Sequence, residues 1–208
     1  MKIRNIIITL VSAIALLISA STISFAKVVG DKIILGAAVS LTGKYSSNGV
    51  HTQNGYNMAV ERINSMGGVT VGGKSYKFEI IYYDDESNSG RAAQLAERLI
   101  KQDGVQFMLG PYSSGLTKAM APVTEKYEVP MVEANGASRS LFTKGYKYLF
   151  AVLAPANLYL DVAIDLAVEK NGGKPVKIAM AFEQDAFSQD VRDWVLLKLL
   201  KEQVLKSL

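Results

Sequence analysis

Short apolar segments alternate with amphipathic helical patterns from residue 32 onward, and this alternation is the strongest constraint on the fold. The first apolar segment has no polar face, which is typical of a strand buried on both sides of a parallel sheet. Because only short loops separate each strand from the next helix, the pattern predicts an α/β fold with a parallel, doubly wound sheet and helices on both of its faces. The predicted strands are residues 32–40, 77–84, 105–109, 131–133 and 176–182.

The helices are predicted from apolar residues that recur at the spacing of one helical face. The first helix ends at Gly67-Gly68, the second begins with Asn88 as its N-cap, and Pro122 is expected to kink the third. A fourth helix precedes the last strand, and a fifth ends the chain. In chain order, the predicted inner faces are Tyr56, Ala59, Val60 and Ile63; Ala92, Leu95, Ala96, Leu99 and Ile100; Leu116, Ala119, Met120, Val123 and Tyr127; and Tyr159, Val162, Ala163 and Leu166.

Residues 1–26 have the three parts of an export signal. Lys2 and Arg4 make the start positive, residues 6–18 are nearly all apolar, and small side chains favour cleavage after Ala26. We therefore expect a signal peptide and a mature chain in the periplasm. A retained membrane anchor is the alternative, because the uncharged stretch nearly matches the length of a bilayer span.

Composition excludes several classes of protein. The chain is 49% hydrophobic and 20% charged, which is typical of a globular domain. Its net charge is only +4 and its lysines and arginines form no dense cluster, so we expect no nucleic-acid partner. The absence of cysteine excludes disulfides, thiolate metal sites, cysteine nucleophiles and a lipid-modified N-terminal cysteine.

Small and hydroxyl-bearing residues follow three of the predicted strands, at residues 40–43 (SLTG), 110–115 (GPYSSG) and 134–138 (ANGAS). The carboxyl ends of parallel strands meet at one edge of a sheet, where α/β proteins bind their ligands. Ser113 and Ser114 also stand at the start of a predicted helix, where hydroxyls and free backbone N–H groups suit a carboxylate or phosphate. Each loop alone is explained by an ordinary turn, but their convergence favours a binding site.

Motifs for catalysis are incomplete. His51 is the only histidine, and we expect it near the surface at the start of the first helix rather than in a catalytic triad. Residues 110–115 lack serine at the centre of a G-x-S-x-G motif. Consecutive acids at 84–86 alternate between strand faces, so a solvated strand end is favoured over a metal site. We therefore expect no enzymatic activity, no metal and no cofactor.

Several segments resemble a known family. VSLTGKYSSNG (39–49), AVERINSMGG (59–68), YYDDESN (82–88) and residues 110–138 are similar to the first lobe of the periplasmic solute-binding proteins of branched-chain-type amino-acid ABC transporters, the Leu/Ile/Val-binding family. The likeness covers most of residues 31–193. It implies a type I periplasmic-binding-protein fold and a monomer that captures an amino acid or similar small carboxylate for an ABC transporter permease. A ligand-sensing receptor lobe is the alternative.

The resemblance also implies roles for individual residues. Ser114 matches the position that holds the ligand α-carboxylate, and Asn135 and Ala137 match positions that meet its α-ammonium and carboxylate groups. Family members often have Thr in place of Ala137, so either Ser138 supplies the hydroxyl or the ligand differs. Phe187 matches an aromatic residue that covers the ligand from the second lobe, with a core position as the alternative. The predicted ligand-binding residues are Ser113, Ser114, Asn135, Gly136, Ala137, Ser138 and Phe187.

By the same resemblance, residues 27–150 are the first ligand-binding lobe and residues 151–208 are a partial second lobe with a divergent tail. From Trp194 onward the sequence no longer resembles the family. We expect a truncated or frame-shifted product that binds its solute weakly. A deliberate one-lobe protein whose apolar tail binds a partner is the alternative.

Overall fold

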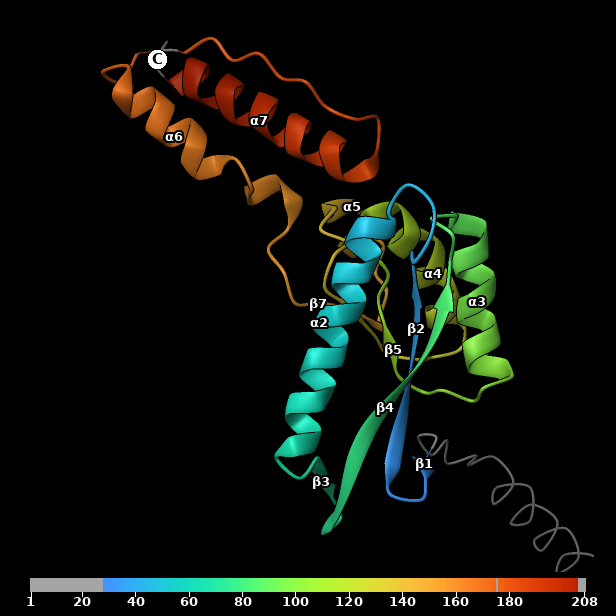
Figure 1. Ribbon diagram of the computed structural model, residues 1–208. Helices are drawn as coiled ribbons and strands as arrows, with labels where there is room; N and C mark the ends of the chain where they lie inside the picture. The colour runs from blue at the N-terminus through green and yellow to red at the C-terminus, as the bar shows by residue number, and fades with distance from the viewer. Residues whose placement is uncertain (1–27, 175, 206–208) are drawn as a thin grey trace, which may run out of the picture.

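The computed structural model describes residues 28–174 and 176–205, with side chains up to residue 200 (Figure 1). The signal peptide predicted for residues 1–26 lies outside these ranges. Within them the chain forms an α/β lobe around one sheet, followed by a helical arm beyond the carboxyl ends of the strands (Figure 1). No helix in the described ranges combines the length and the apolar character needed to cross a membrane.

The sheet is mainly parallel, as the sequence predicts. Its order is β3-β4-β2-β5-β6-β7, and β1 pairs with β2. The pairs that join β4, β2, β5, β6 and β7 are all parallel, whereas the short strands β1 and β3 pair antiparallel with β2 and β4. The strands are β1 (Val28–Val29), β2 (Lys32–Val39), β3 (Val69–Val71), β4 (Lys74–Asp84), β5 (Met108–Leu109), β6 (Met131–Glu133) and β7 (Leu149–Ala151).

Helices cover both faces of the sheet. The long helix α2 lies on one face, and α3 and α4 lie on the other (Figure 1). Within the sheet, β4 lies next to β2 along one edge of that strand, and β5 lies next to it along the other edge. The strand order therefore reverses at β2, so the sheet is doubly wound and its switch point lies beside β2. The helices are α2 (Ser46–Ser65), α3 (Ser89–Lys101), α4 (Ser114–Lys126), α5 (Arg139–Phe142), the 3₁₀ helix η1 (Ala156–Leu158), α6 (Asp161–Lys170) and α7 (Ala186–Leu205).

The helix boundaries predicted at Gly67-Gly68 and at Asn88 are confirmed. Asn88 caps α3, because its side chain accepts a hydrogen bond from the Arg91 N–H at 2.9 Å. Gly67 and Gly68 end α2 with φ angles of 98° and 84°, which glycine adopts without strain. Pro122 lies inside α4, which continues through it.

One core lies between the sheet and the helices α3 and α4. The predicted inner face of α3 is confirmed, with Ala92, Ala96 and Leu99 fully buried and Leu95 nearly so. By contrast, α2 buries only Gly49 and Thr52, and Ala59 on its predicted inner face is exposed. This helix is held to the sheet by close backbone approach at Gly49 and by hydrogen bonds of Tyr56 and Asn64, rather than by a fully buried apolar stripe. The main core cluster is Ile34, Ala38, Ala92, Leu95, Ala96, Leu99, Val105, Met108, Leu116, Met120, Ala121, Val129, Met131, Leu141 and Leu149.

Two predicted strands need correction. The strand predicted at 105–109 pairs only at Met108–Leu109, because the Val105 N–H turns back to the Leu99 carbonyl at the end of α3. The strand predicted at 176–182 is wrong: this segment pairs with no strand in the described ranges. A strand depends on neighbours for its hydrogen bonds, and β-propensity alone does not supply them.

The predicted inner face of the helix in the second part is also wrong. Val162 is 78% exposed and Leu166 is 49% exposed, whereas Ile164 is buried in α6. The side of α6 that packs against α7 is fixed by polar contacts: the Trp194 indole N–H donates to the Asp161 carboxylate at 2.8 Å, and Lys198 pairs with Asp165 at 2.6 Å. Val162 and Leu166 therefore lie on the exposed side of α6, whereas Tyr159 packs on Phe187 of α7 and Ala163 lines a pocket together with Val195 of α7.

Candidate functional site

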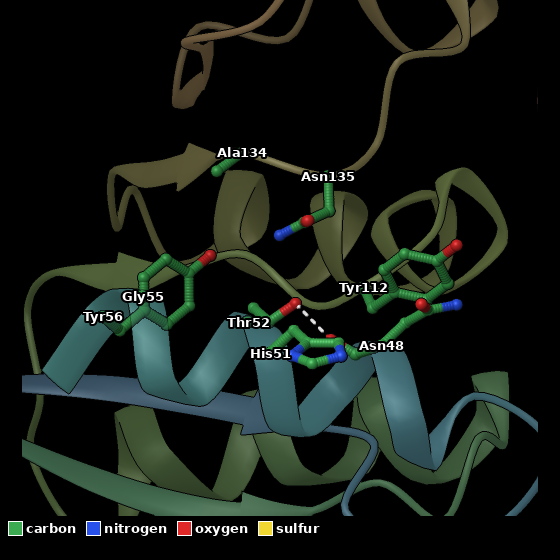
Figure 2. Close-up of a pocket in the computed structure, with 8 residues that line it drawn as sticks. All are labelled: Asn48, His51, Thr52, Gly55, Tyr56, Tyr112, Ala134 and Asn135. Atoms are coloured by element: carbon green, nitrogen blue, oxygen red, sulfur yellow. Dashed lines mark hydrogen bonds between the residues drawn. The ribbon is translucent and has the colours of Figure 1, made fainter. Parts of the chain in front are cut away.

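A cavity of about 430 Å³ lies at the switch point of the sheet, between α2 and the loops that follow β5 and β6 (Figure 2). This is the edge at which the sequence predicts a ligand. Figure 2 shows side chains of α2 on one wall, with Ala134 and Asn135 on the opposite wall and Tyr112 at one end. The lining residues are Asn48, His51, Thr52, Gly55, Tyr56, Tyr112, Ala134 and Asn135.

The start of α2 approaches the sheet closely because Gly49 has no side chain. A Cβ atom at this position would overlap the backbone carbonyl of Ser40, at the end of β2. One turn later, the Thr52 hydroxyl donates to the Asn48 carbonyl at 2.9 Å, and its oxygen can still accept a hydrogen bond at the cavity wall (Figure 2). Glycine thus places the polar face of α2 against the cavity.

Tyr56 joins α2 to the neighbouring strand. Its hydroxyl donates a hydrogen bond to the carbonyl of Gly110, just after β5, at 2.8 Å. Burial, reinforced by the negative charge of Glu133, raises the pKa of Tyr56 well above its usual value. The phenol therefore stays a neutral hydrogen-bond donor, and its ring forms an apolar part of the wall.

Aromatic rings also close the other end of the cavity. Tyr112 packs edge-to-face on Tyr45, with the ring centroids 5.4 Å apart. The ammonium group of Lys44 lies 4.5 Å from the centre of the Tyr45 ring. This stack fixes Tyr112 at the rim, where its ring offers an apolar surface to a ligand.

The cavity lining carries no aspartate, glutamate, lysine or arginine within the described ranges. His51 is exposed on α2, as the sequence predicts, but it lines the cavity. No group of three histidine, cysteine, aspartate or glutamate side chains in the described part is placed to hold a metal. The lining therefore suits a small organic molecule, held by hydroxyl, amide and aromatic groups.

Of the predicted ligand-binding residues, Asn135 lines this cavity. Ser113 instead caps α4: its hydroxyl accepts the Leu116 N–H at 3.3 Å, and its φ angle of 77° is unusual for a residue with a side chain. Ser114 is buried, and its hydroxyl oxygen accepts the Ser138 N–H at 3.0 Å. The structure thus brings the two predicted loops into contact through Ser114 and Ser138, neither of which is in the lining of this cavity.

The other predicted residues on this loop are placed differently. Gly136 is buried so close to α4 that a Cβ atom would come within 2.5 Å of the Thr117 hydroxyl. Ala137 lines a second cavity of about 410 Å³, and Arg139 and Asn157 are also in its lining. The Ser138 hydroxyl donates to the Asp190 carboxylate of α7 at 2.6 Å, which joins the lobe to the helical arm.

Phe187 lies in the first turn of α7, outside both cavity linings. Its ring packs edge-to-face on Tyr159, with centroids 5.3 Å apart. Nearby, Asp185 accepts the N–H groups of Phe187 and Ser188 and so caps the helix. Phe187 is half-buried, and its covering role stays a prediction.

Asp84, the last residue of β4, and Asp85, which follows it, hold the loop after β2. Asp84 accepts the N–H groups of Leu41 and Thr42 at 2.9 and 3.2 Å. Asp85 is fully buried, not solvated as the sequence predicts, and accepts the Ser40 hydroxyl at 2.6 Å. Burial raises its pKa.

Sequence reasoning missed Tyr56, Tyr112 and Thr52 in the lining, and it also missed Glu133 beside it. Glu133 ends β6, is fully buried, and accepts the N–H groups of Asn135 and Gly136, so it shapes the loop that lines the cavity. Burial raises its pKa to about 7. Strand alternation was the available signal, because Glu133 shares the inward face of the short strand with Met131.

Known proteins share both the sequence pattern and this fold. The family described as "Periplasmic binding protein" matches residues 32–204. A leucine-, isoleucine-, valine-, threonine- and alanine-binding protein of Pseudomonas aeruginosa is 27% identical over 148 residues, which are 71% of this chain and 38% of that protein.

Two solved structures are similar to this chain in both sequence and fold. The branched-chain amino-acid transporter substrate-binding protein LivJ of Streptococcus pneumoniae, in complex with isoleucine, is 28% identical with a TM-score of 0.60, over 68% of this chain and 39% of that one. An ABC transporter solute-binding protein of Rhodopseudomonas palustris, in complex with 4-hydroxybenzoate, is 26% identical with a TM-score of 0.68, over 83% and 44%.

The chain spans less than half the length of each of these three relatives. The family match nevertheless covers most of the chain and includes the whole sheet from β2 to β7. The chain therefore belongs to the periplasmic binding protein family, and its sheet and helices form a lobe of the type I fold.

Proposed function

We propose that this chain is the solute-binding component of an ABC importer, or a lobe of it, and that it captures a branched-chain-type amino acid or a similar small carboxylate. The observation that carries the proposal is the cavity at the switch point, walled by α2 and the loops after β5 and β6. Relatives that share this lobe are complexed with isoleucine and with 4-hydroxybenzoate, which are both small carboxylates.

The chemistry of the lining supports such a ligand. Tyr56 and Tyr112 offer apolar ring surface for an aliphatic or aromatic body. Asn135 and Thr52 offer hydrogen bonds to its polar groups. Among the described residues the lining has no aspartate, glutamate, lysine or arginine, which disfavours a multiply charged solute.

Ser114 is proposed to hold the carboxylate together with the first turn of α4. Its hydroxyl oxygen is occupied by the Ser138 N–H, but its hydrogen can still be donated to an anion. Such a charge-assisted bond is worth about 1.5–3 kcal/mol. The remaining predicted contacts are proposed to act from three places: Ser113 from the start of α4, Phe187 from the helical arm, and Gly136, Ala137 and Ser138 from the loop after β6.

We further propose that the protein acts without catalysis, as an exported monomer that delivers its solute to a membrane permease. Family members are transport proteins rather than enzymes. The export signal predicted for residues 1–26 supports a periplasmic location.

Titration of the ¹⁵N-labelled chain with isoleucine and with 4-hydroxybenzoate tests the proposal by NMR, which also detects weak binding. We expect one of them to shift the amide resonances of Asn135, Tyr112 and Thr52 in a saturable manner. Spermidine, a small polycation, is the matched control and should shift none of them. If no carboxylate in an amino-acid and benzoate panel shifts these resonances, the proposed function is wrong.

A further inference from the structure

The carboxyl group of Glu133 contacts three segments near the cavity: the loop after β6, helix α4 and the end of β5. One oxygen, Oε1, accepts the N–H groups of Asn135 and Gly136, and the other, Oε2, lies 2.6 Å from the Thr117 hydroxyl on α4. A Cβ atom at Gly110 would overlap Oε2, so the carboxyl group also packs against the end of β5. None of the ion pairs in the described part involves Glu133.

The protonation state of Glu133 decides which hydrogen bond the Thr117 hydroxyl can donate. The Thr117 hydroxyl has one hydrogen, yet its oxygen lies 2.9 Å from the Ser113 carbonyl and 2.6 Å from Glu133 Oε2. If Glu133 is a neutral acid, its own O–H donates to Thr117, and the Thr117 hydrogen goes to Ser113. If Glu133 is ionised, the Thr117 hydrogen must turn to the carboxylate, and the bond to Ser113 is lost.

We propose that Glu133 is a positioning residue for the ligand cavity: as a neutral acid it holds the 134–136 loop against the turn that begins α4, and its ionisation loosens that link. The consequence for ligand affinity rests on the proposed function. The link between the 134–136 loop and the start of α4 does not rest on the proposed function, because it concerns only contacts within the lobe.

The surroundings of Glu133 favour the neutral form below about pH 7. Burial raises its pKa to about 7, against the opposing hydrogen bonds of Thr117 and the loop N–H groups. The titratable group that faces it from α2 is Tyr56, which is itself neutral; α4 presents the Thr117 hydroxyl, and the end of β5 presents Gly110. The link therefore weakens as the pH rises through neutrality.

The first test uses the ligand-free chain. The ¹⁵N amide resonances of Asn135 and Gly136 report directly on Glu133, because both N–H groups donate to it. Between pH 5 and 9 we expect both to titrate together with a midpoint near pH 7. Glu133→Gln, which mimics the neutral acid, should abolish this titration, and Asp85→Asn, a change at the other buried acid, should leave it intact.

Two variants of Thr117 test the link even if Glu133→Gln fails to fold. Thr117→Val removes a hydrogen bond that lowers the pKa of Glu133, so the midpoint should move to higher pH. Thr117→Ser keeps the hydroxyl and should restore the wild-type midpoint. An unchanged midpoint in Thr117→Val, or the absence of any titration at Asn135 and Gly136, would overturn the proposal.

The second test measures dissociation constants for isoleucine and 4-hydroxybenzoate at pH 6 and pH 8.5. We expect the wild-type constant to rise by about threefold to tenfold with pH, while Glu133→Gln keeps the low-pH value at both. His51, which also lines the cavity, is present in both proteins, so its contribution cancels in the comparison. Equal pH dependence in the two proteins would overturn the effect on affinity. Failure of both probes to bind would count against the proposed function, and the amide titration would still decide the role of Glu133.

Discussion

The hydroxyl of Tyr56, in the middle of α2, donates a hydrogen bond to the carbonyl of Gly110, the residue that follows β5, at 2.8 Å. This bond crosses the switch point of the sheet and fixes the width of the cavity between α2 and the loops opposite it. It also satisfies a carbonyl that is buried, because Gly110 lies against the Glu133 side chain.

Tyr56→Phe should therefore destabilise the fold by about 1–2 kcal/mol, because the Gly110 carbonyl is left buried without this donor. Urea denaturation followed by circular dichroism measures the change. Tyr82→Phe is the matched control: the Tyr82 hydroxyl also contacts α2, through Asn57 at 2.8 Å, but that bond is exposed. Its removal should lower the free energy of unfolding by less than about 0.5 kcal/mol. Equal losses in the two variants would show that the buried bond of Tyr56 contributes no more than the exposed bond of Tyr82.

The fold could be predicted wherever local pattern and tertiary packing agree. The helix α3 has a cap at Asn88 and an inner face from Ala92 to Leu99, and both were found from the sequence. The segment at 176–182 has the composition of a strand but pairs with no neighbour in the described part, so its β-propensity has no effect. Sequence patterns report preferences of a segment, whereas strands also need partners.

The site was only partly predictable for a related reason. Asn135 was found because it stands in a loop after a predicted strand. Tyr56 was assigned to the core because it fits a helical apolar stripe, and only the structure shows that this face of α2 lines the cavity. The contact between Ser114 and Ser138 depends on how two loops meet, which no local pattern specifies.

The two glycines of α2 should respond to substitution in opposite directions. Gly49→Ala places a methyl group against the Ser40 carbonyl, so we expect a loss of about 1–3 kcal/mol in unfolding free energy. Gly55→Ala meets nothing within 4 Å and should gain about 0.5–1 kcal/mol from its better helix propensity. Thermal and urea unfolding of the pair measures both changes, and a stabilising Gly49→Ala would show that α2 does not approach β2 as described.

Asn135→Ala should weaken binding of the carboxylate that proves to be the ligand. Its side chain is the amide on the wall opposite α2, and loss of one or two hydrogen bonds to a ligand corresponds to about a fivefold to fiftyfold increase in the dissociation constant. Asn54→Ala, an exposed change on α2 outside the lining, is the control and should leave the constant unchanged. Isothermal titration calorimetry or NMR titration gives both values; similar effects of the two substitutions would place the ligand elsewhere.

Stability should fall as the pH rises from about 4.5 to about 7 because of Glu133. Burial raises its pKa from 4.5 to about 7 in the folded chain, so over this interval the unfolded chain loses a proton that the folded chain keeps. The 2.5-unit difference corresponds to at most about 3 kcal/mol.

Glu133→Gln removes this titration, so the free energy of unfolding of the variant relative to wild type should increase between pH 5 and pH 8 and then level off. Asp85, whose pKa is also raised by burial, is unchanged in both proteins and cancels in the difference. Urea denaturation at several pH values measures the two curves. Parallel curves would mean that Glu133 has the same pKa in the folded and unfolded chains, which a fully buried acid without an ion pair should not have.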